Sequence, residues 1–283
     1  MRGRKNERGA KAPVKLGIRR LRVYQLLLAA ALLILWHVAT SPTLLPPIYF
    51  DDPNKAAFFF GEPFKAAGRI WQWFASGTIY RHLWVTLIET LLAFVIGTVS
   101  GVLVGIWLAL APTASAVFDP YVKAANAMPR VILAPVFFVW FGLGIASKVA
   151  LGVTLVFFIV FFNVYQGVRE VSPVVLSSAR MLGASPRQLL RFVYLPSAMS
   201  WVFASLHNSV GLAFVGAVVG EYLGSSEGVG YLIQQAEGVF DINTVVAGIV
   251  VLTAFALALD GVVSLVERRL MVWQPRSEDV ERL

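Results

Sequence analysis

The segment VTLVFFIVFF, Val153 to Phe162, is apolar at every position except one threonine. A strand of an outer-membrane barrel alternates apolar and polar residues over about ten positions, whereas this segment presents apolar side chains in every direction. The segment LLLAAALLILW, Leu26 to Trp36, has the same character. The whole chain of 283 residues is 58% hydrophobic and 14% charged, with a mean hydropathy of +0.72, which is more apolar than one water-soluble core requires. We therefore predict an all-α polytopic membrane protein.

Six segments are long enough to cross about 30 Å of hydrocarbon as helices, at about 20 residues each. These predicted spans are Val23 to Thr40, Leu83 to Leu110, Val122 to Phe141, Val149 to Gly167, Ser197 to Leu223 and Thr244 to Val266. The tail before the first span is rich in Lys and Arg, which places it in the cytoplasm by the positive-inside rule. Six spans then place both termini in the cytoplasm.

The first apolar run is longer than the usual signal-peptide core of about 7 to 15 residues and lacks a clean small-x-small cleavage site, so we expect it to be retained. The predicted organisation is a basic cytoplasmic tail at 1–22, the first helix with an outer interfacial segment at 23–80, a transmembrane domain at 81–270, and a cytoplasmic tail at 271–283. The transmembrane domain contains one long cytoplasmic loop at 169–196.

The net charge of +8 does not indicate nucleic acid as a partner, because the basic residues follow the predicted topology. Most of them lie in the tail or at the inner ends of spans, while the last outer loop carries only acidic charges. The expected surroundings are therefore the lipid bilayer.

The sequence contains no recognisable catalytic or metal motif. It has no cysteine, no G-x-x-x-x-G-K-[ST] and no H-E-x-x-H, and each of its three histidines, His37, His82 and His207, stands apart from a second ligand. The glycine-rich segments GLGIASK and GSSEGVG fall in outer loops, where turns are expected rather than phosphate loops. We therefore expect no catalytic residue, no metal site and no cofactor held by this chain.

Small residues recur every four positions along the second predicted span. Gly97, Gly101 and Gly105 form one smooth stripe on a helix, where another backbone approaches closely. This pattern favours a helix-packing face, with a pore-lining role as the alternative.

Several polar residues in the predicted spans need a partner or water, since an unpaired charge in a bilayer is costly. Arg130 and Asp260 both fall in the inner half of their spans, so a salt bridge between them is one interpretation and a gate or anion contact is the other. Asn208 and Ser209 are candidates for the translocation path, with polar contact between helices as an equal alternative.

Pro129 predicts a break in the third span, together with Pro135.

The loop at 169–196 has the signals of two short helices. Ser172 and Pro173 predict a capped first turn, and Gly183 predicts a left-handed stop. Ser185 and Gln188 have the spacing of a capping box for a second helix. A connection between spans does not need two capped helices, so we predict that this loop docks on a soluble partner.

This loop resembles the cytoplasmic signature of the inner-membrane permeases of binding-protein-dependent ABC importers. The signature is E-A-A, a glycine four residues later, and I-x-L-P after a spacer; the matching positions here are Ser177, Ser178, Ala179, Gly183, Val193, Leu195 and Pro196. The departure is Ser177 and Ser178 in place of Glu and Ala. The segments PRVILAPVFFVWFGLGIASK, GEYLGSSEGVGYLI and LVERRLMVW resemble the nitrate, sulfonate and taurine branch.

The resemblance implies a permease in the bacterial plasma (inner) membrane that pairs with a second copy of itself. It also implies two cytoplasmic ABC ATPase subunits, which would bind ATP and Mg, and an extracytoplasmic solute-binding protein. The residues implied in ATPase coupling are Ser177, Ser178, Ala179, Arg180, Leu182, Gly183, Leu195 and Pro196.

The substrate implied is a small solute such as a sulfonate, taurine or a nitrate-like anion. Pyrimidine precursors, riboflavin and aromatic acids remain open, because similar permeases are associated with them. An ion-gradient-driven secondary transporter is the alternative function, and it would usually show inverted repeats and relays of ionisable residues.

Overall fold

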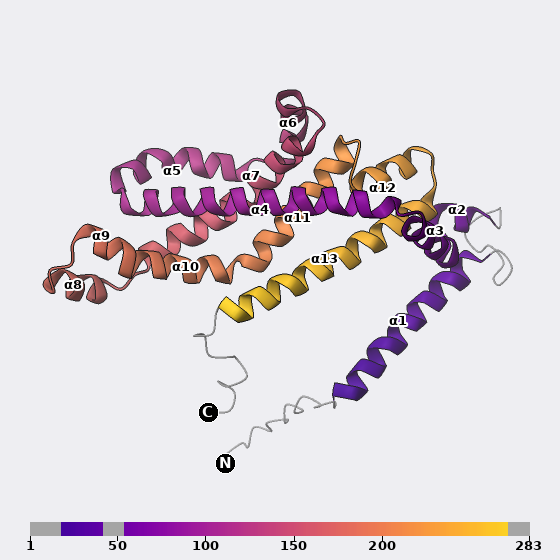
Figure 1. Cartoon of the computed structure of the whole chain (residues 1–283), viewed down its shortest axis with the longest axis horizontal. Coiled ribbons are helices and arrows are strands. Elements are labelled where there is room, and N and C mark those ends of the chain that lie inside the picture. The colour runs from indigo at the N-terminus through magenta and orange to yellow at the C-terminus, as the bar shows by residue number, and fades with distance from the viewer. Residues whose placement is uncertain (1–17, 42–53, 271–283) are drawn as a thin grey trace, which may run out of the picture. The chain divides into compact units, whose positions relative to one another are not determined.

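The computed structural model describes residues 18–41 and 54–270, and every regular element in those ranges is helical. Figure 1 shows their order. The elements are α1 (Ile18–Thr40), α2 (Lys55–Phe60), α3 (Pro63–Ser76), α4 (Thr78–Leu110), α5 (Pro112–Ala127), η1 (Arg130–Leu133), α6 (Ala134–Phe141), α7 (Ile145–Arg169), α8 (Pro173–Met181), α9 (Pro186–Leu189), η2 (Leu190–Tyr194), α10 (Leu195–Ala204), α11 (Leu206–Leu223), α12 (Val229–Gly238) and α13 (Ile242–Leu270).

The chain divides into two units, residues 1–65 and 66–283. In the first unit α1 is almost wholly exposed along its apolar run, as expected of a helix that meets lipid. Its far end is tied to the following segment, where Trp36 Nε1 donates to the Phe60 carbonyl at 3.2 Å and the His37 ring meets Phe64 edge-on. The predicted tails at 1–17 and 271–283 lie outside the described residues.

The core of the second unit is the pair α4 and α7. Gly97, Gly101 and Gly105 lie against Val156, Val160 and Val164 in that order, so the two helices run parallel. A Cβ on Gly101 would stand 2.9 Å from the Phe157 carbonyl oxygen, which leaves no room for a side chain. The glycine stripe is thus a helix contact in this structure.

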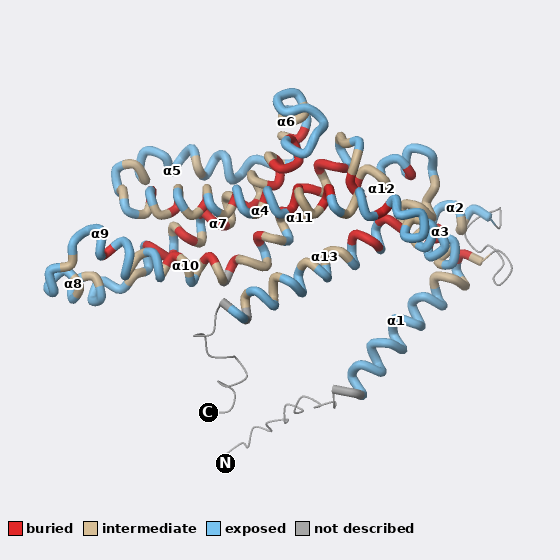
Figure 2. Tube along the Cα trace, viewed as in Figure 1, coloured by how far each residue is buried: buried red, intermediate tan, exposed pale blue. Residues whose placement is uncertain are grey.

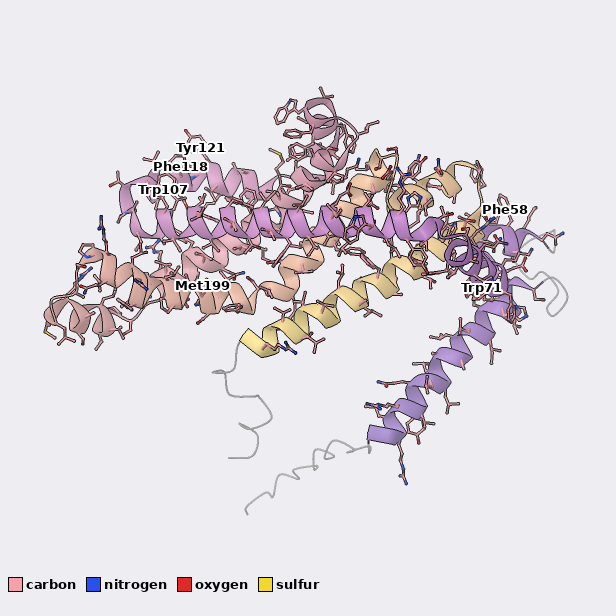
Figure 3. All side chains as sticks on the ribbon, in the orientation of Figure 1. Phe58, Trp71, Trp107, Phe118, Tyr121 and Met199 are labelled. Atoms are coloured by element: carbon pink, nitrogen blue, oxygen red, sulfur yellow. The ribbon has the colours of Figure 1, made fainter. Side chains whose placement is uncertain are left out.

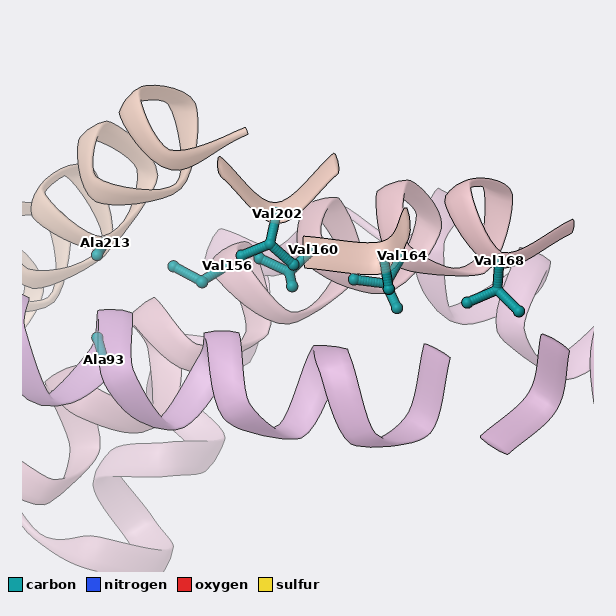
Figure 4. Packing of buried hydrophobic residues seen from close by; sticks show 8 residues of the cluster. Ala93, Val156, Val160, Val164, Val168, Val202 and Ala213 are labelled. Atoms are coloured by element: carbon teal, nitrogen blue, oxygen red, sulfur yellow. The ribbon is translucent and has the colours of Figure 1, made fainter. Parts of the chain in front are cut away.

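One row of valines on α7 fills the space between this contact and the neighbouring helices. Figure 4 shows Val156, Val160, Val164 and Val168 in a line, with Val202 of α10 and Ala213 of α11 beside them. Figure 2 shows the buried residues following α4, α7 and α11. β-Branched residues have few rotamers to lose in a helix, so this row packs at little entropic cost.

The third predicted span is broken. α5 ends at Ala127, Met128 and Pro129 are extended, and η1 with α6 continues at 89° to α5. Proline disfavours helical backbone at the residue before it, which explains the break at Met128. Because α4 and α7 are parallel, the chain between them must return toward the starting end of α4, and it does so through the bent pair of α5 and α6. The expectation of a break at Pro129 is confirmed.

The fifth predicted span is also bent, by 58° between the α9–α10 segment and α11. The π-helical turn η2 precedes Pro196, where the proline ring lacks an N–H to donate. Among the described residues, α1, α4, α7 and α13 each meet the length and hydropathy of a span, and the two bent pairs raise the total to as many as six. The orientation of the termini stays a prediction.

Between α11 and α13 the chain folds back through α12, which had been expected only as loop. Ile79 of α4, Val229 of α12, and Val251 and Leu252 of α13 form a second small core there. Asp241 begins α13 by accepting hydrogen bonds from the Thr244 N–H at 3.1 Å and hydroxyl at 2.6 Å. Arg69 of α3 completes the corner with an ion pair to Asp241 at 3.0 Å.

Candidate functional site

A helical hairpin, residues 172–189, projects from the helical bundle beyond α7. Ser172 holds the N-cap position of α8 in extended backbone, and Pro173 takes the first turn. The predicted cap position is confirmed, although the Ser172 side chain makes no capping hydrogen bond. No residue of α8 is buried.

Gly183 ends α8 with a φ of +81°, which confirms the predicted left-handed stop. The Gly183 N–H donates to the Arg180 carbonyl and the Ala184 N–H donates to the Ala179 carbonyl, both at 3.0 Å. These two bonds form a Schellman motif, which satisfies carbonyl groups that the helix end leaves free. The turn is therefore fixed by its own backbone rather than by contacts with the bundle.

The second helix begins with the predicted capping box. The Gln188 N–H donates to Ser185 Oγ at 3.3 Å, and the Ser185 N–H donates to Gln188 Oε1 at 2.8 Å. Both backbone donors are satisfied by side chains at the helix start, so α9 is set in place although it is only four residues long.

The tip of the hairpin is apolar and exposed. Met181 is 82% exposed and Leu182 is 88% exposed. Behind them lies a hollow of about 250 Å³, lined by Ala179, Leu182, Gly183, Ala184, Gln188, Leu189, Phe192 and Val193. The basic residues at 180, 187 and 191 are exposed around it, as are Ser177, Ser178, Leu195 and Pro196. Apolar residues surrounded by polar and basic ones are typical of an interaction surface.

The hairpin is joined firmly to α7 by the helix that follows it. Ser197 Oγ donates to the Gly167 carbonyl at 2.8 Å. The Trp201 ring packs directly on Gly167, in the space where any side chain would stand. A movement of the hairpin is therefore expected to shift α10 against α7, because the contacts of Ser197 and Trp201 with Gly167 leave no loose segment between them.

Three buried ionisable residues lie together near the start of α7 and the end of α11, away from the hairpin. This cluster was not predicted from the sequence. Glu89, Lys148 and Glu221 are each 1% exposed. Thr86 Oγ1 donates to Glu221 Oε1 at 2.6 Å, and the Gly230 N–H donates to Glu221 Oε2 at 2.7 Å. The cluster ties α4, α7, α11 and the start of α12 together.

Lys148 lies in the first turn of α7, where it is buried together with Ser147. Its ammonium donates to the carbonyls of Leu143 and Gly144. The segment GSSEGVG, expected to be a plain turn, closes over the cluster, and its Gly228 N–H donates to His82 Nδ1 at 3.1 Å. The available sequence signal was that Glu89 needs a partner inside the membrane.

The predicted pairing of Arg130 with Asp260 is wrong. Arg130 Nη2 donates to the Asn126 carbonyl at 3.1 Å, and its guanidinium lies 4.8 Å from the centre of the Phe158 ring. Asp260 Oδ1 instead lies 3.0 Å from His207 Nδ1. The break at Met128 and Pro129 turns Arg130 back toward the end of α5, whereas a straight third span would have placed it elsewhere.

His207 stands between two carboxylates of α13, since its Nε2 is 2.6 Å from Glu267 Oε2. The neighbouring candidates point differently: Asn208 is exposed, whereas Ser209 is 1% exposed and its hydroxyl has no partner among the described residues. Within residues 18–41 and 54–270, no three His, Asp or Glu side chains are placed to hold a metal ion.

Comparison with known proteins places this architecture among transport proteins. The family model for the binding-protein-dependent transport system inner membrane component matches residues 101–272. The chain is 29% identical to the putative aliphatic sulfonates transport permease protein SsuC of Bacillus subtilis (strain 168), over 88% of this chain and 87% of that protein. It is 30% identical to the taurine transport system permease protein TauC of Escherichia coli (strain K12), over 86% and 87% respectively.

Among solved structures, an inward-facing form of the MetNI methionine ABC transporter matches with a TM-score of 0.52 and 22% identity. The match covers 66% of this chain and 95% of that one. At this identity the likeness shows a shared fold.

Proposed function

Because the chain belongs to the family of binding-protein-dependent transport system inner membrane components, we propose that it forms the membrane pathway of an importer driven by separate ATPase subunits. The chain is a transport component rather than an enzyme. The observation that carries the proposal is the hairpin at 172–189, a self-capped and exposed element on a bundle of apolar helices.

The hairpin is the coupling element of this proposal. Leu182 and the hollow behind it are the surface that an ATPase subunit contacts, with Ser177, Ser178, Ala179 and Arg180 along the adjoining helix face. An ATPase moves the permease only through contacts that differ between its two states. The Ser197 and Trp201 contacts with Gly167 then carry that difference into α7.

The proposed cargo is a small anion of the sulfonate and taurine class, which is the cargo named for two relatives of the chain. An extracytoplasmic binding protein delivers it, a second copy of the permease completes the pathway, and the bacterial inner membrane holds the assembly. Arg130 is the proposed anion contact, because its buried Nε has no acceptor among the described residues. Asn208, Ser209 and Asp260 remain proposed positions along the path or gate.

The test is co-purification with the ATPase subunit and with the solute-binding protein expressed from the same genome. Leu182→Asp places a charge on the hairpin tip without disturbing a buried contact, and Val239→Asp, at a 74% exposed position beyond α12, is its matched control. We expect Leu182→Asp to remain in the membrane fraction but to lose the ATPase and taurine-stimulated ATP hydrolysis, and Val239→Asp to keep both.

Equal ATPase recovery with both variants would remove the hairpin from the coupling role. Failure of the wild-type chain to recruit any ATPase, with uptake abolished by collapsing the ion gradient, would instead establish the secondary-transporter alternative. Stimulation by another solute but not by taurine would replace the cargo class and leave the coupling proposal in place.

A further inference from the structure

A second hollow lies where α4 and α7 end, on the same side of the bundle as the hairpin. It has a volume of about 510 Å³ and is lined by Leu108, Ala109, Pro112, Ser115, Ala116, Asp119, Tyr165 and Arg169. We propose that this hollow binds a phosphate group, held by Arg169 and Ser115.

Tyr165 holds Arg169 in position for this role. Arg169 Nη1 donates to Tyr165 Oη at 2.7 Å, and the guanidinium lies 5.4 Å from the centre of the same ring. One edge of the guanidinium is therefore occupied, and its remaining N–H groups have no acceptor among the described residues. A planar guanidinium with a free edge is suited to bidentate contact with phosphate oxygens.

Ser115 is oriented through the same tyrosine. Its Oγ lies 2.6 Å from Tyr165 Oη. Either hydroxyl can be the donor of this bond, and in the arrangement where Tyr165 donates to Ser115 the Ser115 hydroxyl is left to donate into the hollow. The chain of contacts thus presents two kinds of donor, a charged one and a neutral one, from α7 and α5.

The charge of the hollow favours an anion. Asp119 is the only acid in its lining, and Lys123 pairs with it at 2.7 Å. Among the described residues no carboxylate pairs with Arg169, because the nearby Glu170 accepts from Gln166 instead. Arg169 is therefore a cation in the lining without an ion-pair partner among the described residues.

The surrounding residues favour phosphate over other anions. Trp107 of α4 and Phe118 and Tyr121 of α5 are exposed on the two helices that supply most of the lining (Figure 3). Exposed Trp and Tyr next to apolar spans settle at the level of the lipid headgroups, where the abundant anion is phosphate. The phosphate has two sources, an anionic phospholipid or free inorganic phosphate, and they share this chemistry.

The inference rests on the proposed function only for the side of the membrane that the hollow faces. Native mass spectrometry of the full-length chain, titrated with phosphatidylglycerol or phosphatidylcholine, tests it without ATP hydrolysis, so its result is separate from that of the coupling test. We expect wild type to bind phosphatidylglycerol about tenfold more tightly than phosphatidylcholine, because the choline cation of phosphatidylcholine neutralises the charge of its phosphate. Arg169→Gln should lose this preference. Arg191→Gln is the control, since it removes an equal charge from the same side of the bundle but outside the hollow.

Tyr165→Phe is the second variant, because it keeps the ring and removes only the hydroxyl that positions Arg169 and Ser115. It should lose part of the preference, so the proposal stays testable if Arg169→Gln does not fold. Inorganic phosphate that raises the thermal midpoint of wild type but not of Arg169→Gln, without any lipid preference, would identify free phosphate as the source. Lipid preference and phosphate effect that are both unchanged in Arg169→Gln would overturn the proposal.

Discussion

Thr86 Oγ1 donates to Glu221 Oε1 at 2.6 Å in the fully buried interior, joining α4 to α11. Thr86 and Glu221 are 135 residues apart in the sequence. The neighbouring charges of Lys148 and Glu89 belong to the same cluster. The cluster therefore joins α4, α7, α11 and the start of α12 in one buried place.

Removing the Glu221 carboxylate should destabilise the fold strongly. Glu221→Ala leaves the Gly230 N–H without its acceptor and the Thr86 hydroxyl with only the His82 carbonyl, and a buried unpaired donor costs about 1–3 kcal/mol. The measurement is the temperature at which half of the purified protein remains monodisperse. The control is Glu227→Ala, which breaks only the exposed pair with Arg81 and should cost about 1 kcal/mol or less. Equal losses in the two variants would contradict a structural role for the buried cluster.

Closing the glycine stripe should force α4 and α7 apart. Gly101→Ala places a Cβ 2.9 Å from the Phe157 carbonyl and 3.0 Å from Val160 Cβ, so we expect a loss of about 1–3 kcal/mol from overpacking. Gly261→Ala on α13 meets nothing within 4 Å and should be neutral or slightly stabilising, because alanine favours helix. The same thermal assay distinguishes these outcomes.

The turn of the hairpin should tolerate asparagine but not valine at position 183. The φ of +81° costs a β-branched residue about 1–2 kcal/mol, whereas asparagine adopts left-handed backbone readily. No atom lies within 4 Å of a Cβ built there, so space does not distinguish the two variants. We expect Gly183→Asn to keep ATPase recruitment and Gly183→Val to weaken it. Equal recruitment would mean that the left-handed turn is not needed for docking.

The corner at Asp241 should make part of the stability depend on pH. Burial alone would raise the pKa of Asp241, but the hydrogen bonds from Thr244 and the Arg69 guanidinium outweigh it and hold the pKa below its ordinary value of 3.8. A carboxyl with a lowered pKa stabilises the fold while it is ionised. The contribution is therefore present above pH 3.8 and is lost as the pH falls through the lower, folded-state value.

Asp241→Asn measures this contribution, since an asparagine oxygen still accepts from the Thr244 N–H. Wild type should exceed the variant by roughly 0.5–1 kcal/mol at pH 7, the range of a partly exposed ion pair, and the gap should close below pH 3.8. A gap of constant size across this range would mean that the charge of Asp241 does not stabilise the fold.

Charge reversal should not restore function to the Arg130 and Asp260 positions. The two side chains have separate partners, Asn126 and His207, so Arg130→Asp combined with Asp260→Arg should give losses of transport that add. Recovery by the double variant in an uptake assay would mean that the two residues meet in another state of the transport cycle.

The elements that follow local rules were predictable from sequence. The lengths of the apolar segments predicted the spans. The spacing of the helix-capping residues predicted the hairpin and its stop at Gly183. What was not predicted depends on contacts between distant segments: the partner of Arg130 depends on the 89° bend, and the burial of Lys148 in one cluster with Glu89 and Glu221 depends on which helices become neighbours. Glu89 lies within an apolar span, so the sequence indicates that its carboxyl needs a polar partner. Which residues lie beside it follows only from the packing of α4 on α7.

The buried cluster has a consequence for biosynthesis. Lys148 follows Glu89 by roughly 60 residues, which takes the ribosome about 3–12 s at about 5–20 residues per second. During that interval the second span carries a carboxyl whose neighbours have not yet been made. An ionised Glu89 exposed to lipid in that interval would be unpaired, which costs about 2.5–3.5 kcal/mol or more at the bilayer centre, so contact with water or protein favours this helix until the α7 segment has emerged.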